Sequence, residues 1–130
     1  MALPAYSKYR LYITENSSPS GTIKYVSIAE FSGHESADGL SANLLVGTAS
    51  ASSAFSGWPA SGAFDSNPGT SWSSESSVSG VEWLRIDLAS AVQIRTFKIT
   101  SINASSGYYV PKNFIVQGSN DGTNWDNLIS

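Results

Sequence analysis

A tight loop rich in oxygen-bearing side chains is the segment of this 130-residue chain most suited to chemistry. It lies within residues 60–72, ASGAFDSNPGTSW, where Asp65, Asn67 and Thr70 flank a Pro-Gly pair. Calcium takes about six to eight oxygen ligands and accepts backbone carbonyls, so an irregular loop with a carboxylate and a hydroxyl suits it. The same pattern suits an Asx turn, in which Asp65 caps backbone amides without a metal. We favour calcium, in a structural role that pins the loop.

Aromatic residues in loops rich in Gly and Ser are the second chemical feature. Trp58, Tyr108 and Tyr109 lie in such loops, and Phe55 is close to the first of them. Sugars bind by stacking an apolar ring face on an aromatic ring while polar groups bond their hydroxyls, so exposed loop aromatics are natural candidates. The alternative is that Trp58 and Pro59 fold back over the end of the domain as a plug. The sequence leaves both arrangements open.

Catalytic chemistry finds little support in the sequence. His34 is the only histidine, and without a second one to complete a metal-binding pair it is interpreted as a solvated loop residue. No nucleophile elbow, phosphate-binding glycine loop or cysteine is present. The acidic residues fall on predicted strands, turns and the oxygen-rich loop, whereas a glycosidase needs its carboxylates in a cleft. We therefore predict that the protein is not an enzyme.

Composition excludes several kinds of partner and location. The net charge is −3 and the seven Lys and Arg residues are scattered, so we expect no nucleic-acid partner. No apolar segment has the length of a signal peptide or a membrane span, which predicts no membrane insertion and no cleaved signal. The chain has no cysteine, which favours a bacterial or viral origin over a secreted animal one.

The elements that must position these loops are short strands. Strand patterns occupy residues 9–14, 24–31, 44–49, 82–88, 92–101, 113–119 and 125–129, and no window has a sustained helical period. We expect the first two segments to form a hairpin with a long tip, and Asn120-Asp121-Gly122 to turn a second hairpin. In residues 92–101 the apolar phase switches, which indicates a bulge or a strand buried on both faces. The pattern predicts an all-β protein with one domain over residues 1–130, an antiparallel β-sandwich.

Three tryptophans adjoin the predicted strands. Trp72, Trp83 and Trp125 stand at strand ends or within strand patterns. Large aromatic side chains in such places are usually buried, so we expect all three in the core.

Three phrases of the chain resemble the discoidin family, also called coagulation factor (F5/8) type C domains. They are residues 63–72 (AFDSNPGTSW), 83–88 (WLRIDL) and 114–125 (FIVQGSNDGTNW), in the family's order and at its spacing. Each phrase alone is weak, but together they cover some 60 residues. The resemblance implies the galactose-binding-like jelly roll, a form of antiparallel β-sandwich.

The order of the chain differs from that of the family. The strand pair that usually closes the domain resembles residues 9–13 (YRLYI) and 26–31 (VSIAEF), which open this chain. The resemblance therefore implies a circularly permuted domain, which sandwiches tolerate because their termini commonly lie close together. This permuted order resembles tail and adhesion modules of bacteriophages.

The resemblance also implies a ligand set. Family members often hold a structural calcium, which here implies the carboxylates of Asp65 and Glu30, the Thr70 hydroxyl, and carbonyls near Phe64 and Asn67. One departure is Ser66, because the family has Gly there and a positive φ would strain Ser. The family's galactose motif is absent: residues 73–76 contain no His or aromatic, and the loop before Phe114 offers only Lys112 in place of Arg.

The sequence thus predicts a non-catalytic carbohydrate-binding or adhesion module, part of a phage tail or virion surface that contacts host glycans. Its glycan contacts are expected from Trp58, Tyr108, Tyr109 and Lys112. Low affinity per copy predicts multicopy display or a homo-oligomer. The alternative is a structural or decoration protein of a virion that contacts only other virion subunits.

Overall fold

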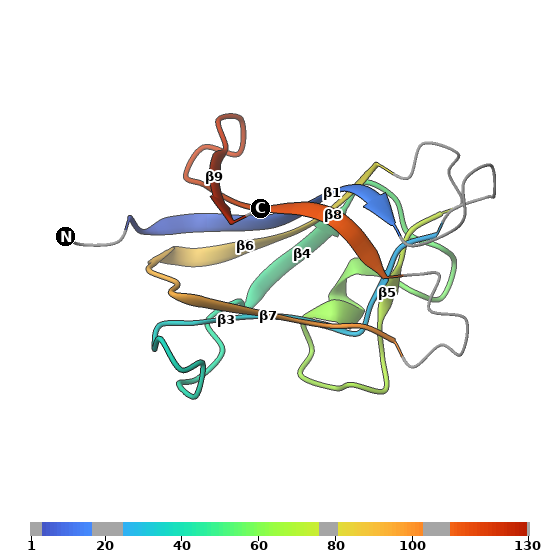
Figure 1. Cartoon of the computed structure of the whole chain (residues 1–130), viewed down its shortest axis with the longest axis horizontal. Helices are drawn as coiled ribbons and strands as arrows, with labels where there is room; N and C mark the ends of the chain where they lie inside the picture. The colour runs from blue at the N-terminus through green and yellow to red at the C-terminus, as the bar shows by residue number, and fades with distance from the viewer. Residues whose placement is uncertain (1–3, 17–24, 76–80, 103–109, 130) are drawn as a thin grey trace.

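The computed structural model describes residues 4–16, 25–75, 81–102 and 110–129, and it is an antiparallel β-sandwich (Figure 1). Its elements in chain order are β1 (Tyr6–Asn16), β2 (Ser27–Ile28), β3 (Glu30–His34), β4 (Gly47–Ala51), the 3-10 helix η1 (Ala60–Ala63), β5 (Trp72–Ser73), β6 (Glu82–Val92), β7 (Thr96–Thr100), β8 (Pro111–Ser119) and β9 (Asp126–Ile129). In the described ranges no helix has the length and apolar character that a bilayer crossing requires.

Two layers of strands form the sandwich. The first is a five-stranded sheet in the order β4-β6-β1-β8-β9. The second contains the pairs β2–β5 and β3–β7, with β2 and β3 almost continuous along the chain. All pairings are antiparallel. The predicted fold class is therefore confirmed.

Strand β1 lies at the centre of the first sheet because its alternating residues supply one apolar face. Leu11 lies opposite Leu84 of β6 and Val116 of β8, and all three side chains are buried. Across the core, Phe31 of β3 is fully buried and stacks on Phe97 of β7 at a centroid distance of 5.9 Å. Burial of these apolar faces against one another is the main stabilising force of such a fold.

The expected hairpin between residues 9–14 and 24–31 is wrong. Strand β1 pairs with β6 and β8, whereas β2 and β3 pair with β5 and β7 in the other layer. Both segments are strongly apolar, and they bury those faces against each other across the core instead of sharing one sheet. The second hairpin is confirmed, because β8 and β9 pair around the predicted turn, where Gly122 has φ +77°.

The phase switch in residues 92–101 is a crossing between the layers, not a bulge or a strand buried on both faces. Strand β6 ends at Val92 in the first sheet, and β7 begins at Thr96 against β3 in the second. Ile94 in the connection is buried. Because the chain changes layer, the core lies on the other side of it, and the apolar phase reverses.

Of the three tryptophans expected in the core, only Trp72 is there. It is fully buried and its indole N–H donates to the Ser53 carbonyl at 2.9 Å. Trp83 is half-buried on the outer face of β6, since its neighbour Leu84 takes the inner face. Trp125 is also half-buried, and its ring lies 4.2 Å from the guanidinium carbon of Arg10. These two predictions were wrong, because Trp83 alternates with the inward-facing Leu84 and Trp125 packs on Arg10 instead of in the core.

Candidate functional site

The oxygen-rich loop places two carboxylates at one backbone amide. The Asn67 N–H donates to Glu30 Oε1 and to Asp65 Oδ1, each at 3.0 Å. Glu30 opens β3, whereas Asp65 and Asn67 follow η1, so the fold brings distant segments together here. Figure 1 shows this loop below η1, at the end of the sandwich where β5 lies.

The Thr70 hydroxyl completes a group of converging oxygens. Its oxygen contacts Asp65 Oδ2, lies 2.9 Å from the Asn67 carbonyl oxygen and lies 3.4 Å from that of Gly62. Glu30, Asp65, Asn67 and Thr70 of the predicted ligand set thus meet at this loop. The Gly62 carbonyl, which was not in the predicted set, also faces the Thr70 hydroxyl, and no side-chain pattern in the sequence marks it.

Phe64, the remaining member of the predicted set, also lies in this loop. Its amide donates to the Ser61 carbonyl at 3.1 Å, and its ring centroid is 5.9 Å from that of Phe31. The ring therefore anchors the loop to the core, which fixes the position of the backbone from Gly62 to Asp65.

The pKa values of the two carboxyl groups shift in opposite directions. Burial, together with the hydrogen bond to Asp65, raises the pKa of Glu30 from 4.5 to about 7. The hydrogen bond from Thr70 holds the pKa of Asp65 below its ordinary value. Within the described ranges neither carboxylate forms an ion pair with Lys or Arg. Proximity of two acids without a basic partner is a condition that a bound cation would relieve.

The donor set fits a hard cation. Two carboxylates, a hydroxyl and two carbonyls are oxygen ligands of the kind that calcium accepts in flexible geometry. In the described part of the chain no group of three or more His, Cys, Asp or Glu side chains is placed to hold a metal ion, so the set would rely on hydroxyl and carbonyl oxygens beside its two carboxylates. Ser66, next to Asp65, has φ 60°, so it takes the strained conformation that its position in the loop demands.

Glu30 predicts a pH dependence of stability when no divalent cation is present. A carboxyl whose pKa is raised on folding stabilises the protein fully below pH 4.5, and this contribution is lost as the pH rises through about 7. Glu30→Gln should remove that loss. We expect the melting temperature of the wild type in chelator to fall relative to the variant between about pH 5 and pH 8. A difference between the two proteins that stays constant over this range would contradict the prediction.

A shallow aromatic groove lies beside the oxygen-rich loop. Trp58 and Phe55 expose 45% and 46% of their surface, and the rings of Phe55 and Tyr25 meet edge to face at 6.0 Å. The groove has a volume of about 280 Å³ and is lined by Tyr25, Ser27, Phe55, Trp58 and Ser73. Trp58 also borders a hollow of about 270 Å³ that reaches Asp65 and Thr70. One exposed indole therefore connects the groove with the loop.

The backbone under Trp58 is tied to strand β5. The Phe55 N–H donates to the Ser73 carbonyl at 2.7 Å, and the Ser73 N–H donates to the Trp58 carbonyl at 3.2 Å. Gly57, with φ +88°, makes the tight turn between the two aromatic residues. The backbone of Trp58 is thus fixed, and 45% of the residue's surface is exposed.

Of the other predicted glycan residues, Lys112 does not line this groove. Lys112 is exposed, lies 3.4 Å from Glu15 Oε1 and lines a different hollow with Thr14 and Phe114. Tyr108 and Tyr109 lie outside the described residues. Tyr25 was missed, because it was assigned to a predicted strand, whereas it precedes β2 and faces Phe55.

His34 is not the solvated residue that the sequence suggested. It ends β3 in a buried position, and its Nδ1 and Nε2 lie 2.7 Å from the Ser41 carbonyl and 2.9 Å from Ser32 Oγ. Both ring nitrogens are therefore occupied by local hydrogen bonds, which indicates a structural role.

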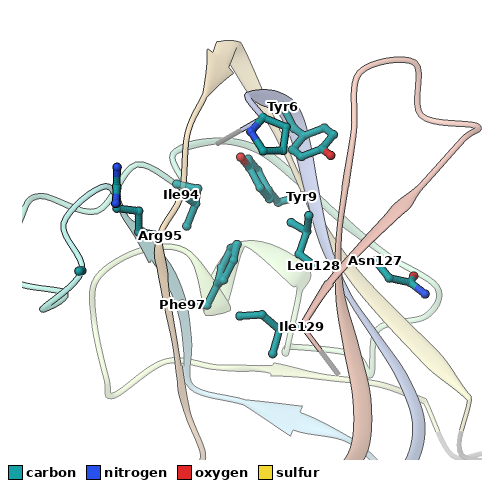
Figure 2. Close-up of a pocket in the computed structure, with 10 residues that line it drawn as sticks. Tyr6, Tyr9, Ile94, Arg95, Phe97, Asn127, Leu128 and Ile129 are labelled. Carbon is teal, nitrogen blue, oxygen red and sulfur yellow. The ribbon is translucent and has the colours of Figure 1, made fainter. Parts of the chain in front are cut away.

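A hollow of about 480 Å³ lies between the layers, and Figure 2 shows the rings of Tyr6, Tyr9 and Phe97 on its wall. The hydroxyls of Tyr6 and Tyr9 donate hydrogen bonds within the protein. Tyr6 donates to the Asp126 carboxylate at 2.9 Å, and Tyr9 donates to the Val92 carbonyl at 2.6 Å. The side chains of Arg95 and Asn127 add polar groups to its lining. Tyr6 and Tyr9 are buried, however, whereas the groove at Trp58 has exposed aromatic rings, so the groove suits the stacking of a sugar ring better.

Comparison with known proteins gives one match. The family model described as the F5/8 type C domain matches residues 48–130. This range contains β4 apart from its first residue, β5 to β9, Trp58 and the oxygen-rich loop. It leaves β1, β2 and β3 with Glu30 outside. No curated protein and no solved structure matches the chain.

Proposed function

Because the chain belongs to the F5/8 type C domain family, we propose that it is a non-catalytic module that binds surface glycans at the groove of Trp58. Proteins of this family are commonly ligand-binding or carbohydrate-binding modules, generally without catalytic activity. The groove, and no part of the oxygen-rich loop, would make the main contact with the sugar.

The exposed aromatic pair carries this proposal. Trp58 and Phe55 each expose nearly half of their surface on a backbone fixed to β5, which is unusual for large aromatic side chains without a ligand or partner. Ser27 and Ser73, whose hydroxyl oxygens lie 2.5 Å apart, are polar residues that line the same groove. A pyranose ring could stack on the indole and place its hydroxyls toward these serines.

We further propose that the module is displayed in several copies on a virion surface or phage tail. A groove of this size buries little of a sugar, so affinity per site is low and useful binding needs multivalency. We propose that the domain is circularly permuted, an order that would support a phage-type module. Strand β1 lies outside the matched residues and yet occupies the sheet between β6 and β8, which both lie inside them.

A glycan array probed with a multimeric form of the protein tests the proposal. We expect the protein to bind a limited set of glycans on the array. Free sugar at a concentration on the order of 1–10 mM should compete for the site and release the bound protein. The second candidate, a virion protein that contacts only other subunits, predicts silence on the array together with stable association with a virion protein. Silence on the array together with such an association would overturn the glycan proposal in favour of the second candidate.

We also propose that calcium binds the oxygen-rich loop and stabilises it. The residues that would hold the ion are Glu30, Gly62, Asp65, Asn67 and Thr70, through two carboxylates, a hydroxyl and two carbonyls. The ion would offset the negative charge of the two acids and would keep the loop at a fixed distance from Trp58. Its role is structural, and no step of sugar binding passes through it.

Removal of calcium should lower the melting temperature of the wild type. A ligand present at about 100 times its dissociation constant stabilises the folded state by about 2.7 kcal/mol, which is several degrees for a domain of this size. Asp65→Asn should abolish the difference between calcium and chelator. Glu75→Gln, which changes an exposed acid outside the loop, should retain it. The same melting temperature of the wild type with calcium and with chelator would contradict the calcium proposal.

A further inference from the structure

The segment that contains β4 has no charge and carries most of the large hydrophobic side chains that are exposed in the described ranges. Residues 39–64 include no Asp, Glu, Lys or Arg, although the chain as a whole carries a net charge of −3. Four of the six large hydrophobic side chains that are exposed in the described ranges lie in this segment: Leu40 (82%), Val46 (66%), Phe55 (46%) and Trp58 (45%). Phe55 and Trp58 belong to the groove, but Leu40 and Val46 have no part in it.

Strand β4 leaves one backbone edge without a strand partner in the described structure. It ends the order of the five-stranded sheet and pairs only with β6 (Figure 1). The Ser52 N–H donates to the Trp83 carbonyl at 2.9 Å, and antiparallel ladders alternate, so Thr48 and Ser50 also direct their backbone groups toward β6. The N–H and C=O groups of Gly47, Ala49 and Ala51 then point outward from the sheet.

The sequence and register of β4 itself lack features that usually prevent strand addition. Natural edge strands are protected by Lys, by Pro, by a bulge or by a covering segment. The sequence of β4 is GTASA, without charge or proline, and its register with β6 runs unbroken from Gly47–Leu88 to Ala51–Leu84. Gly47, Thr48 and Ser50 are exposed. Their small side chains permit close approach of another strand.

We propose that β4 is a dimerisation edge, on which β4 of a second copy of this chain pairs antiparallel about a two-fold axis at Ala49. In this register Ala49 lies opposite Ala49 of the second copy, and Gly47 lies opposite Ala51. The residues whose backbone groups point outward are then the ones that form hydrogen-bonded pairs, so the register agrees with the alternation of the ladder. The two five-stranded sheets become one continuous sheet.

Charge and symmetry favour a second copy as the occupant. Two molecules of the same net charge repel, and an uncharged edge is the surface on which they meet with least repulsion. An antiparallel pairing of one strand with itself is self-complementary, as a two-fold interface requires. Exposed Val46, adjacent to the edge, adds apolar area to the contact. The inference is independent of glycan binding, although a dimer would present two grooves.

A pair of double variants tests the register directly. In the proposed dimer the solvent-facing residue at position 48 lies opposite position 50 of the second copy. Thr48→Lys with Ser50→Lys places like charges opposite each other twice, whereas Thr48→Lys with Ser50→Glu places opposite charges there. Within one copy, position 48 faces Asp87 and position 50 faces Arg85 on β6. The second variant therefore sets each new charge opposite a charge of the other sign, and it should fold as well as the wild type.

Sedimentation velocity over about 1–500 μM protein gives the readout. We expect wild-type dimers, a dissociation constant raised about tenfold or more in the Lys/Lys variant, and wild-type or tighter association in the Lys/Glu variant. Ala49→Pro removes an outward N–H without removing a bond to β6, and it should also give a monomer with unchanged melting. A wild type that stays monomeric throughout, or a dimer that all three variants leave unchanged, overturns the proposal. So does a Lys/Glu variant that dissociates as the Lys/Lys variant does.

Discussion

Replacing Trp58 by alanine is expected to abolish glycan binding by the multimeric protein while leaving its melting temperature within about 2 °C of the wild type. Trp58 exposes 45% of its surface and is held by backbone hydrogen bonds that alanine retains. Truncation of a central aromatic residue in a binding site costs about 2 kcal/mol or more, which is about 30-fold per site. Because multivalent binding multiplies the loss at each site, the array signal should fall below detection.

Two companion variants make this result specific to the groove. Phe55→Ala removes the second exposed ring and should weaken binding about tenfold per site. Trp83→Ala removes an indole of equal size from the outer face of β6, outside the groove, and should leave glycan binding unchanged. If Trp83→Ala abolished binding and Trp58→Ala did not, the sugar would bind the outer face of the sheet instead.

The largest expected effect on stability belongs to Trp72→Ala. The side chain is fully buried between the layers, and the substitution leaves a cavity and removes the partner of the Ser53 carbonyl. Such substitutions cost about 3–5 kcal/mol out of a total stability of about 5–15 kcal/mol. We expect the melting temperature to fall by about 10–20 °C and the urea midpoint to fall in proportion.

Trp125→Ala is the matched control for the core. Its ring covers Arg10 and Arg85 at 4.2 and 5.3 Å from their guanidinium carbons, on the outer face of the sheet. Cation–π contacts at such positions contribute about 0.5–1 kcal/mol, so this variant should lose only a few degrees. Equal losses in the two variants would contradict the different burial of the two rings.

Most strands and the family could be predicted from the sequence, because alternation and turn residues are local signals. The β8–β9 hairpin shows this most simply, since Asn120-Asp121-Gly122 marks its turn without reference to any other segment. The oxygen-rich loop was found in the same way. The carboxylate of Glu30 entered the ligand set only through the resemblance, since no local pattern joins residue 30 to residue 65.

The remaining features depend on tertiary pairing, which a single sequence does not encode locally. Residues 9–14 and 24–31 have the same apolar character whether they share a sheet or face each other across the core, so the hairpin was the wrong choice. Trp83 could have been placed correctly, because Leu84 and Ile86 already define the inner face of β6. Tyr25 lines the groove only because residues 55–58 are hydrogen-bonded to β5. No spacing of residues in the sequence predicts the contact between Tyr25 and Phe55.

The four tryptophan indole N–H signals in a proton–nitrogen correlation spectrum give the most direct test of glycan binding at the groove. Each indole has a different environment: Trp58 is exposed, Trp72 is buried and bonded to Ser53, and Trp83 and Trp125 are half-buried. The spectrum would be recorded during titration with a glycan that binds on the array, and Trp58→Phe would assign the relevant signal. Our account predicts that the Trp58 signal moves progressively and saturates while the other three stay in place. Saturating shifts of Trp83 or Trp125, with the Trp58 signal unmoved, would contradict it.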